Sequence, residues 1–331
     1  MNYYKYMSAL LNKENNNESV QKSIEQTYEV FENWEDSKLD LKENLLRGLY
    51  SYGFSKPSPI QQKSIISIIK GKDIIAQAQS GTGKTGAFSV GALQSIDENS
   101  KTLQVLLLSP TRELALQSYN VIDNLSKKMN INKILLIGGT SIDSDIHNIN
   151  NTSPNIAIGC TGRVFDLIRR GKLDYKNIKL MILDEADEML SQGFKTQVYS
   201  IFRELDQDIQ VVLFSATIPP DLSRLTDKFM RDPIKILLET SELSLEGITQ
   251  YKIEIGKDEY KLDVLKDIFE NISICQTIIY CNNINRVCEL YDNLKKANFS
   301  VQYIHSKFSG KLIFLSSHSS KLSLIIVIYT L

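Results

Sequence analysis

The sequence predicts an α/β fold in which a parallel sheet is covered by helices on both faces. Short, uninterrupted apolar runs alternate with helical stretches along the chain, at Ile74–Ala76, Val105–Leu108, Ile134–Ile137, Ile156–Ile158, Leu180–Leu183 and Val211–Phe214. Strands without a polar alternation are typical of parallel sheets that are buried on both sides. A glycine-rich phosphate-binding motif stands between the first of these runs and an apolar helix, which is the context that such a motif requires.

Length and composition set the outer bounds. The chain has 331 residues, and at ~150 residues per domain this length favours two domains. With 42% hydrophobic and 23% charged residues, the composition excludes wholesale disorder and collagen-like repeats. A net charge of −1 excludes a histone-like polycation, but a local basic groove for nucleic acid is compatible with it.

The elements follow in a clear order along the chain. Apolar residues recur at helical spacing from Leu39 to Tyr52, and Gly53 and Pro57 then stop that helix. After the apolar runs named above, a second and shorter α/β unit begins, with a helix at Tyr260–Phe269, a strand at Thr277–Tyr280, a helix at Arg286–Lys296 and a strand at Val301–Ile304. We therefore predict a flexible Asn-rich arm at 1–30, a complete domain at 31–232, a linker at 233–246, a partial second domain at 247–308 and an atypical apolar, Ser-rich tail at 309–331.

Neither disulfides nor a membrane segment is expected. The four cysteines form no CxxC pair, so we expect reduced intracellular thiols rather than a zinc module or a disulfide framework. The N-terminal residues 1–17 lack the apolar stretch of a signal peptide. A polar insert at 316–321 divides the apolar tail into two pieces, and neither reaches the ~20 residues that a membrane span needs. A tail anchor is the minor alternative.

The motif Ala78–Thr85 has the composition of a P-loop. Glycines let the backbone wind tightly enough for successive N–H groups to face phosphate oxygens, and the following helix N-terminus adds a positive dipole. Lys84 is then expected to reach the β- and γ-phosphates of ATP, and Thr85 to ligate Mg²⁺. The remaining residues expected to bind the nucleotide here are Gln79, Ser80, Gly81, Thr82 and Gly83.

Two adjacent carboxylates, Asp184 and Glu185, end another buried run. This placement favours Asp184 as a Mg²⁺ ligand and Glu185 as the group that orients or deprotonates a water molecule. The alternative is that the pair caps the N-terminus of the next helix, because acidic residues are common there.

Several motifs in a fixed order carry a resemblance to a known family. Asp184–Asp187 spells the motif of the DEAD-box RNA helicases, and the chain is similar to those of the initiation factor 4A type from about Leu41 to His305. The other matches are Gly53-Phe54 with Pro57–Gln61 (the Q motif), Pro110–Leu114 (motif Ia), Gly138-Gly139 (the GG element) and Ser215–Thr217 (motif III).

This resemblance implies ATP-dependent remodelling of RNA by two RecA-like domains, the second of them incomplete here. Gln61 would hydrogen-bond the adenine edge beside Phe54. An upstream aromatic, Trp34 or alternatively Phe31, would stack on the base. A hydrophobic anchor is the other interpretation of Trp34. Ser215 and Thr217 would couple the nucleotide site to RNA through Asp187. The residues implied to contact the RNA backbone without reading bases are Pro110, Thr111, Arg112, Gly139, Thr161, Gly162 and Arg163; a surface salt bridge is the alternative for the two arginines.

The chain departs from the family pattern at several positions. Gly159–Arg163 reads Gly-Cys-Thr-Gly-Arg where the family has Gly-Thr-Pro-Gly-Arg, so the fixed φ of proline is lost and we expect weaker RNA binding. In motif IV, Asn283 replaces a threonine, and Ser306-Lys307 replaces the Gly-Asp that follows the histidine in the family.

Beyond Phe308 nothing matches motif V or motif VI, and residues 311–331 contain no arginine. In the family, motif VI supplies the arginine fingers that stabilise charge on the transferring phosphoryl group, an effect worth roughly 10³–10⁵ in turnover. We interpret the tail as sequence foreign to the family, from a frameshift, a misassigned end or a decayed gene. A shortened strand that completes a small sheet is the alternative.

Two functions from different classes follow from these observations. One is an RNA-stimulated ATPase and helicase of the translation-initiation type that uses ATP and Mg²⁺; the other is a protein that binds nucleotide and RNA without helicase activity. A metabolic P-loop kinase is disfavoured by the Q motif and motif Ia. We expect RNA as the partner, with a translation scaffold or exon-junction proteins as further partners, a monomeric state, and a cytoplasmic location with a nuclear one as the alternative.

Overall fold

The computed structural model describes residues 28–79, 81–191, 193–237, 251–272, 276–304 and 324–329. The chain divides into two compact units, Met1–Glu246 and Gly247–Leu331. Each unit is described separately below.

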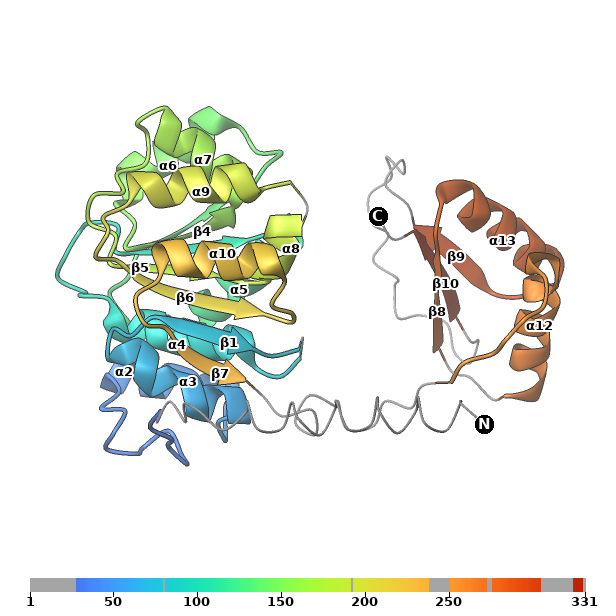
Figure 1. Cartoon of the computed structure of the whole chain (residues 1–331), viewed down its shortest axis with the longest axis horizontal. Helices are drawn as coiled ribbons and strands as arrows, with labels where there is room; N and C mark the ends of the chain where they lie inside the picture. Colours follow the sequence, from blue (N-terminus) through green and yellow to red (C-terminus); the bar gives the residue numbers. More distant parts are fainter. Residues whose placement is uncertain are drawn as a thin grey trace, which may run out of the picture. The chain divides into compact units, whose positions relative to one another are not determined.

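The first unit contains a seven-stranded sheet with the strand order β3-β4-β2-β5-β6-β1-β7 (Figure 1). Every strand pair in it is parallel. Its strands are β1 (Ile74–Gln77), β2 (Val105–Ser109), β3 (Lys133–Leu136), β4 (Ile156–Cys160), β5 (Leu180–Leu183), β6 (Gln210–Ser215) and β7 (Ile234–Leu237). Its helices are α2 (Glu43–Tyr52), α3 (Pro59–Ile69), α4 (Lys84–Ser95), α5 (Arg112–Leu125), α6 (Ile142–Thr152), α7 (Thr161–Arg169), α8 (Ala186–Ser191), α9 (Lys195–Glu204) and α10 (Pro220–Phe229).

Both faces of this sheet are buried, as the apolar runs predict. Alternate residues of each strand enter different cores: Leu107 and Ile182 pack with helices α2 to α5, whereas Leu106 and Met181 pack with helices α7 to α10. Figure 1 shows α9 and α10 crossing one of these faces. Because side chains alternate across a strand, a strand with helices on both sides needs apolar residues at every position. The prediction of a parallel sheet covered on both faces is confirmed.

Two predicted boundaries of the first unit differ from the structure. The helix predicted from Leu39 begins at Glu43, because Asp40 adopts a left-handed backbone (φ 42°) that interrupts a helix. Residues 234–237, predicted as the start of a linker, form β7 and pair with β1. Ile236 in that strand is fully buried, so its apolar residues complete the sheet edge instead of connecting two domains.

The second unit contains a three-stranded parallel sheet with the order β8-β10-β9. Its elements are the 3₁₀ turn η1 (Asp258–Tyr260), α12 (Lys261–Asn271), β8 (Gln276–Cys281), α13 (Ile284–Lys296), β9 (Val301–Ile304) and β10 (Leu324–Tyr329). Val287 and Leu294 of α13 pack against Val301 in a small core. Asn283, the departure in motif IV, caps α13 by accepting a hydrogen bond from the Arg286 N–H (2.9 Å).

Part of the predicted tail forms a strand. Residues 324–329 lie as β10 between β8 and β9, which is the arrangement that the alternative interpretation of the tail expected. The predicted arm up to residue 27, the residues 305–307 and the rest of the tail lie outside the described residues. Of the helices described, none is long and apolar enough to cross a membrane.

Candidate functional site

The predicted site residues follow strands of the first unit, at the carboxyl edge of its sheet. In a parallel sheet all carboxyl ends meet at one edge, which is where ligands of open α/β folds bind. The strand order separates this edge into two halves. The P-loop, the Asp184-Glu185 pair and the Ser215–Thr217 segment follow β1, β5 and β6, whereas Pro110–Arg112, Gly138–Gly139 and Thr161–Arg163 follow β2, β3 and β4. We name these, after the ligands predicted from the sequence, the nucleotide half and the RNA half.

The P-loop has the geometry of a phosphate cradle. Gly81 (φ 86°) and Gly83 (φ 99°) adopt left-handed backbone conformations, and helix α4 begins directly afterwards at Lys84. The Thr82 hydroxyl donates to the Gln79 carbonyl (2.7 Å) and closes the loop. The sequence therefore places a helix N-terminus where anions bind favourably. Gln79 and Gly81 are exposed to solvent. Ser80, between them, lies outside the described residues.

Gln61 connects the Q motif to the P-loop. Ser58 and Gln61 form a capping box at the start of α3, in which the Gln61 Oε1 accepts from the Ser58 N–H (2.8 Å). The Gln61 Nε2 donates to the carbonyl of Gly83 (3.1 Å). A Cβ atom on Gly86 would lie 2.5 Å from Nε2 and 2.9 Å from the Phe54 ring, so only glycine lets α4 approach this closely. The Gln61 side chain is buried (5% exposed), and among the described residues these two hydrogen bonds orient its amide toward the P-loop.

The upstream aromatics are core residues. Trp34 and Phe31 are 1% and 0% exposed, and Trp34 stacks on Phe54 with ring centroids 6.3 Å apart. Phe54 is half-buried and lies against α4. Because a buried ring has no face left for a base, this arrangement matches the hydrophobic anchor for Trp34 and leaves Phe54 as the aromatic beside Gln61.

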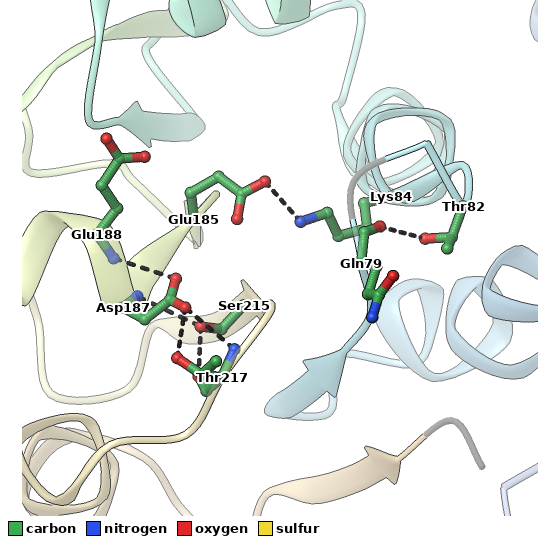
Figure 2. Close-up of polar contacts among 8 residues, drawn as sticks. All are labelled: Gln79, Thr82, Lys84, Glu185, Asp187, Glu188, Ser215 and Thr217. Atoms are coloured by element: carbon green, nitrogen blue, oxygen red, sulfur yellow. Dashed lines mark hydrogen bonds and ion pairs between the residues drawn. The ribbon is translucent and has the colours of Figure 1, made fainter. Parts of the chain in front are cut away.

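Lys84 and Glu185 face each other across the nucleotide half (Figure 2). The Lys84 Nζ lies 2.7 Å from the Glu185 Oε1, and the two side chains are 5% and 14% exposed. Glu185 adopts a left-handed backbone (φ 51°) between β5 and α8, a conformation that costs a non-glycine residue roughly 1 kcal/mol. The turn aims its carboxylate at Lys84 instead of at the helix N-terminus, so the capping alternative does not describe Glu185.

Asp184 is the buried member of the carboxylate pair. It is 4% exposed, and burial, the largest influence, raises its pKa to about 6 in spite of the nearby positive charge of Lys84. Its Oδ1 has no hydrogen-bond partner among the described residues. A buried carboxylate oxygen without a donor is costly unless a cation binds it. The oxygen of Asp184 and the half-buried Thr85 beside the P-loop are the kind of hard ligands that Mg²⁺ prefers.

Asp187 joins α8 to the end of β6 (Figure 2). Its Oδ2 accepts from the Thr217 hydroxyl (2.6 Å) and from the Thr217 N–H (3.0 Å), and the Asp187 N–H donates to the Ser215 hydroxyl (3.3 Å). Burial works to raise the pKa of Asp187, but hydrogen bonding with Thr217 and Ser215 outweighs it and lowers the pKa. The predicted contact of Ser215 and Thr217 with Asp187 is therefore present in the structure.

In the RNA half, Thr111, Arg112 and Gly139 lie together. Thr111 caps α5 by accepting from the Leu114 N–H (3.2 Å), and Arg112, the first residue of α5, is exposed. The Arg112 guanidinium lies against the Gly138–Gly139 backbone, since a Cβ atom on Gly139 would be 2.7 Å from its Nη1. Pro110, which is buried, connects β2 to this group.

Two residues of the motif at 159–163 do not present their polar groups to solvent. The Thr161 side chain is 2% exposed and its hydroxyl donates to the Met189 sulfur (3.4 Å), so the hydroxyl is bonded within the protein, and its contact with a phosphate stays a prediction. Without the proline, the chain passes directly from β4 into α7 at Thr161. Arg163 is 9% exposed and forms an ion pair with Asp145, which is the salt bridge expected as the alternative, although it is buried rather than at the surface. A Cβ atom on Gly162 would lie 4.0 Å from the Gln197 Oε1, at ordinary van der Waals distance.

Comparison with known proteins identifies the family. The family model for DEAD/DEAH box helicases matches residues 58–225. The chain belongs to this family. The eIF4A helicase of Kluyveromyces lactis is 50% identical over 284 residues, which are 86% of this chain and 71% of that protein, and the helicase fal1 of Schizosaccharomyces pombe is 47% identical over 274 residues, covering 83% and 69%. Both relatives are named ATP-dependent RNA helicases, so the resemblance to DEAD-box helicases of the initiation factor 4A type is confirmed, and with it the class of ATP-hydrolysing enzyme.

Solved DEAD-box structures have the same fold. Dbp5 of S. cerevisiae bound to RNA and ADP BeF3 superposes with a TM-score of 0.72 at 30% identity, covering 88% of this chain and 75% of that chain. A DEAD-box protein from Methanococcus jannaschii gives 0.61 at 30% identity, covering 90% and 80%. The RecA-like fold class of the DEAD-box chain is thereby confirmed.

The sequence reasoning missed two residues of the RNA half, Thr140 and Asp145, which both bond Arg163. An acidic residue in the first turn of a helix is ordinarily explained by its favourable interaction with the helix dipole, so Asp145 needs no partner to account for it. Only its burial, which the sequence does not reveal, distinguishes Asp145 from the neighbouring exposed Asp143.

Proposed function

We propose that this DEAD-box chain binds Mg²⁺·ATP in the nucleotide half and the RNA sugar–phosphate backbone in the RNA half of one sheet edge. The observation that carries the proposal is the Lys84–Glu185 pair at 2.7 Å, beside a buried Asp184 that has an unpartnered oxygen. Phosphoryl transfer requires a cation that stabilises the phosphates and a carboxylate that positions the attacking water, both pre-arranged in a site that excludes most water.

ATP binding exchanges partners in the nucleotide half. The phosphates compete with Glu185 for Lys84, while the left-handed glycines of the loop and the N-terminus of α4 supply N–H donors. Glu185, once separated from Lys84, is a carboxylate in a site that is largely closed to solvent and can accept a proton from an attacking water. Gln61 and Phe54 are placed to contact the base.

Mg²⁺ supplies charge neutralisation for the phosphates when it is bound. Asp184 and Thr85 are the residues that would hold it, directly or through water, because they lie at the ends of β5 and of the P-loop. Asp184 must be ionised to do so, and a cation partner favours its charged form in the buried site.

RNA binding uses the exposed Arg112, the main chain of Gly139, and the neighbouring Thr111 and Gly162. Such contacts read the backbone and not the bases, so they specify no particular RNA. The Dbp5 structure with RNA supports this assignment by similarity of fold.

We further propose that the 331-residue chain by itself turns ATP over slowly. It contains no arginine after Arg286, and an arginine finger contributes roughly 10³–10⁵ to turnover in phosphoryl transfer. It would then act as a nucleotide- and RNA-binding protein without helicase activity. We propose that it works as a monomer in the cytoplasm with a translation scaffold as partner. A nuclear exon-junction role is the alternative.

Equilibrium binding tests the assignment of the two halves. We expect the purified chain to bind a fluorescent ATP analogue in a Mg²⁺-dependent manner, and to bind single-stranded RNA with an affinity that falls as salt rises, because phosphate contacts release counterions. Nucleotide binding that is indifferent to Mg²⁺ would contradict the role of Asp184 and Thr85. A flat salt response would contradict backbone recognition.

A further inference from the structure

The two arginines of the RNA half differ in their surroundings. Arg112 is exposed, and its guanidinium lies against the backbone of Gly138 and Gly139. Arg163 is 9% exposed and its partner Asp145 is 8% exposed. An exposed guanidinium can meet a phosphate without losing a protein partner, whereas a buried and paired one must first break its pair.

The Arg163 guanidinium is already committed to the protein. Its Nη1 donates to the Asp145 carboxylate and to the Thr140 hydroxyl (3.1 Å), and its Nη2 donates to the Thr140 carbonyl (2.7 Å). Three of the five donors of the guanidinium are therefore used on two neighbouring elements. These bonds connect the start of α7, the first turn of α6 and the loop after β3.

Thr140 is the end of the turn that contains the GG element. Its hydroxyl donates to the Ile137 carbonyl (2.9 Å), which closes the turn, and Gly139 inside it has a φ of 89°. On its other side the turn is in contact with the Arg112 guanidinium. Glycine loses more conformational freedom on ordering than any other residue. A short turn that contains a glycine therefore needs fixed contacts to hold one geometry.

We propose that Arg163, held by Asp145, is a positioning residue that fixes the Ile137–Thr140 turn for RNA, and that Arg163 itself makes no phosphate contact. Gly139 and Arg112 then present their donors to the backbone from a preformed surface, which lowers the ordering cost of binding. This inference rests on the proposed assignment of the RNA half, and it reverses the family-based expectation for Arg163.

Asp145→Asn separates the two roles because they predict opposite signs. If Arg163 positions the turn, weakening its pair loosens Gly139 and lowers RNA affinity, by about tenfold or more for the loss of one charged hydrogen bond. If Arg163 contacts a phosphate, releasing it from Asp145 leaves RNA affinity unchanged or raises it. Asp143→Asn is the matched control, since it removes the same charge from the same helical turn at an exposed position.

The salt dependence of binding to fluorescein-labelled oligouridine supplies the second readout. We expect Asp145→Asn and Arg163→Lys to lower affinity while keeping the wild-type slope of log K against log salt, because no phosphate contact is lost. Arg112→Ala should lower the magnitude of the slope by ~0.7, the value for one phosphate contact to a single strand. A shallower slope in Arg163→Lys, or unchanged or tighter binding in Asp145→Asn, would overturn the inference.

Hydrogen exchange tests the positioning role without RNA. Amide exchange of residues 137–140 should become faster in Asp145→Asn and Arg163→Lys and stay at the wild-type rate in Asp143→Asn, with ATP-analogue affinity unchanged in all three. Unchanged exchange of this turn in the first two variants would also overturn the inference. If the wild-type chain fails to bind RNA, the proposed function of the RNA half fails, while the exchange result still decides whether Arg163 holds the turn.

Discussion

The nucleotide half and the RNA half of the same sheet edge are built in different ways. In the nucleotide half, charged groups are buried and face one another, as Lys84 and Glu185 do at 2.7 Å. In the RNA half, the exposed Arg112 lies on a glycine turn, and the buried arginine is turned inward to Asp145. In the proposed function, ATP therefore replaces contacts that the protein already makes, whereas RNA adds to a surface that is already formed.

This difference follows from the ligands. A nucleotide brings several charges into a water-poor site, so its partners must be pre-arranged and neutralised by one another when it is absent. An RNA backbone is long and solvated, and its recognition depends on exposed cations and main-chain donors. The predictions below test the comparison in order of decreasing effect.

Lys84→Ala should disable the nucleotide half alone. We expect ATP-analogue affinity to fall by at least about 100-fold, roughly 2.7 kcal/mol, because the phosphates lose their buried cation. RNA affinity without nucleotide should stay within about twofold, since the loops after β2, β3 and β4 are untouched. Lys101→Ala, an exposed lysine before β2, is the control. Unchanged nucleotide affinity in Lys84→Ala would mean that the P-loop assignment is wrong.

Asp184→Asn should stabilise the protein in Mg²⁺-free buffer. The pKa of Asp184 is about 6, above the ~3.9 of an unfolded aspartate, so the folded state holds the extra proton between these values and stability falls as pH rises through that window. Above about pH 6 the buried Asp184 is ionised, and the loss of folding stability caused by its charge is complete. We expect a gain of about 2 kcal/mol in the free energy of unfolding at pH 8 and almost none at pH 4, measured by urea denaturation.

Asp187→Asn is the matched control for that measurement. The pKa of Asp187 is lowered by hydrogen bonding, so its contribution to stability is present above the unfolded pKa and is lost as pH falls. This variant should therefore be less stable than wild type at pH 8. If both substitutions shift stability in the same direction at pH 8, the two aspartates do not have the distinct environments described here.

The aromatic pair separates a base contact from a core anchor. Phe54→Leu should weaken ATP-analogue binding by about fivefold, because an aromatic ring beside the base is lost. Trp34→Phe, at a position 1% exposed, should lower the free energy of unfolding by about 1 kcal/mol and leave nucleotide affinity within about twofold. The opposite pattern would restore Trp34 as the residue that stacks on adenine.

Thr217→Val should have the smallest effect. It removes the hydroxyl that donates to Asp187 at 2.6 Å while the Thr217 N–H still donates at 3.0 Å. We expect a loss of ~0.5 kcal/mol in the free energy of unfolding, since the site is exposed and one hydrogen bond is kept. A loss as large as that of Asp187→Asn would mean that the hydroxyl alone holds α8 to β6.

Much of this architecture could be predicted from the sequence because its signals are local. Each of the six apolar runs is a strand, since burial on both faces demands apolar residues at every position, and the P-loop is recognisable because left-handed turns select glycine.

The remaining features depend on contacts between distant segments. Nothing near Arg163 in the sequence shows that Asp145, eighteen positions away, would bury its charge. Trp34 was equally compatible with a base contact and with a core position, and only its packing on Phe54 shows which surface it has left. Residues 234–237, which read Ile-Lys-Ile-Leu, resembled a junction because their strand partner, β1, lies far earlier in the chain.

The central proposal is that this edge binds ATP and RNA in a chain whose 331 residues contain no arginine after Arg286 to act as the motif VI finger. Steady-state ATP hydrolysis by the purified 331-residue protein, with and without single-stranded RNA, tests it most directly, with Lys84→Ala as the blank for contaminating ATPase. We predict saturable ATP binding with hydrolysis close to the blank and no more than about twofold stimulation by RNA, because a missing finger lowers turnover by roughly 10³–10⁵. Robust hydrolysis that RNA stimulates by about tenfold or more would contradict this account.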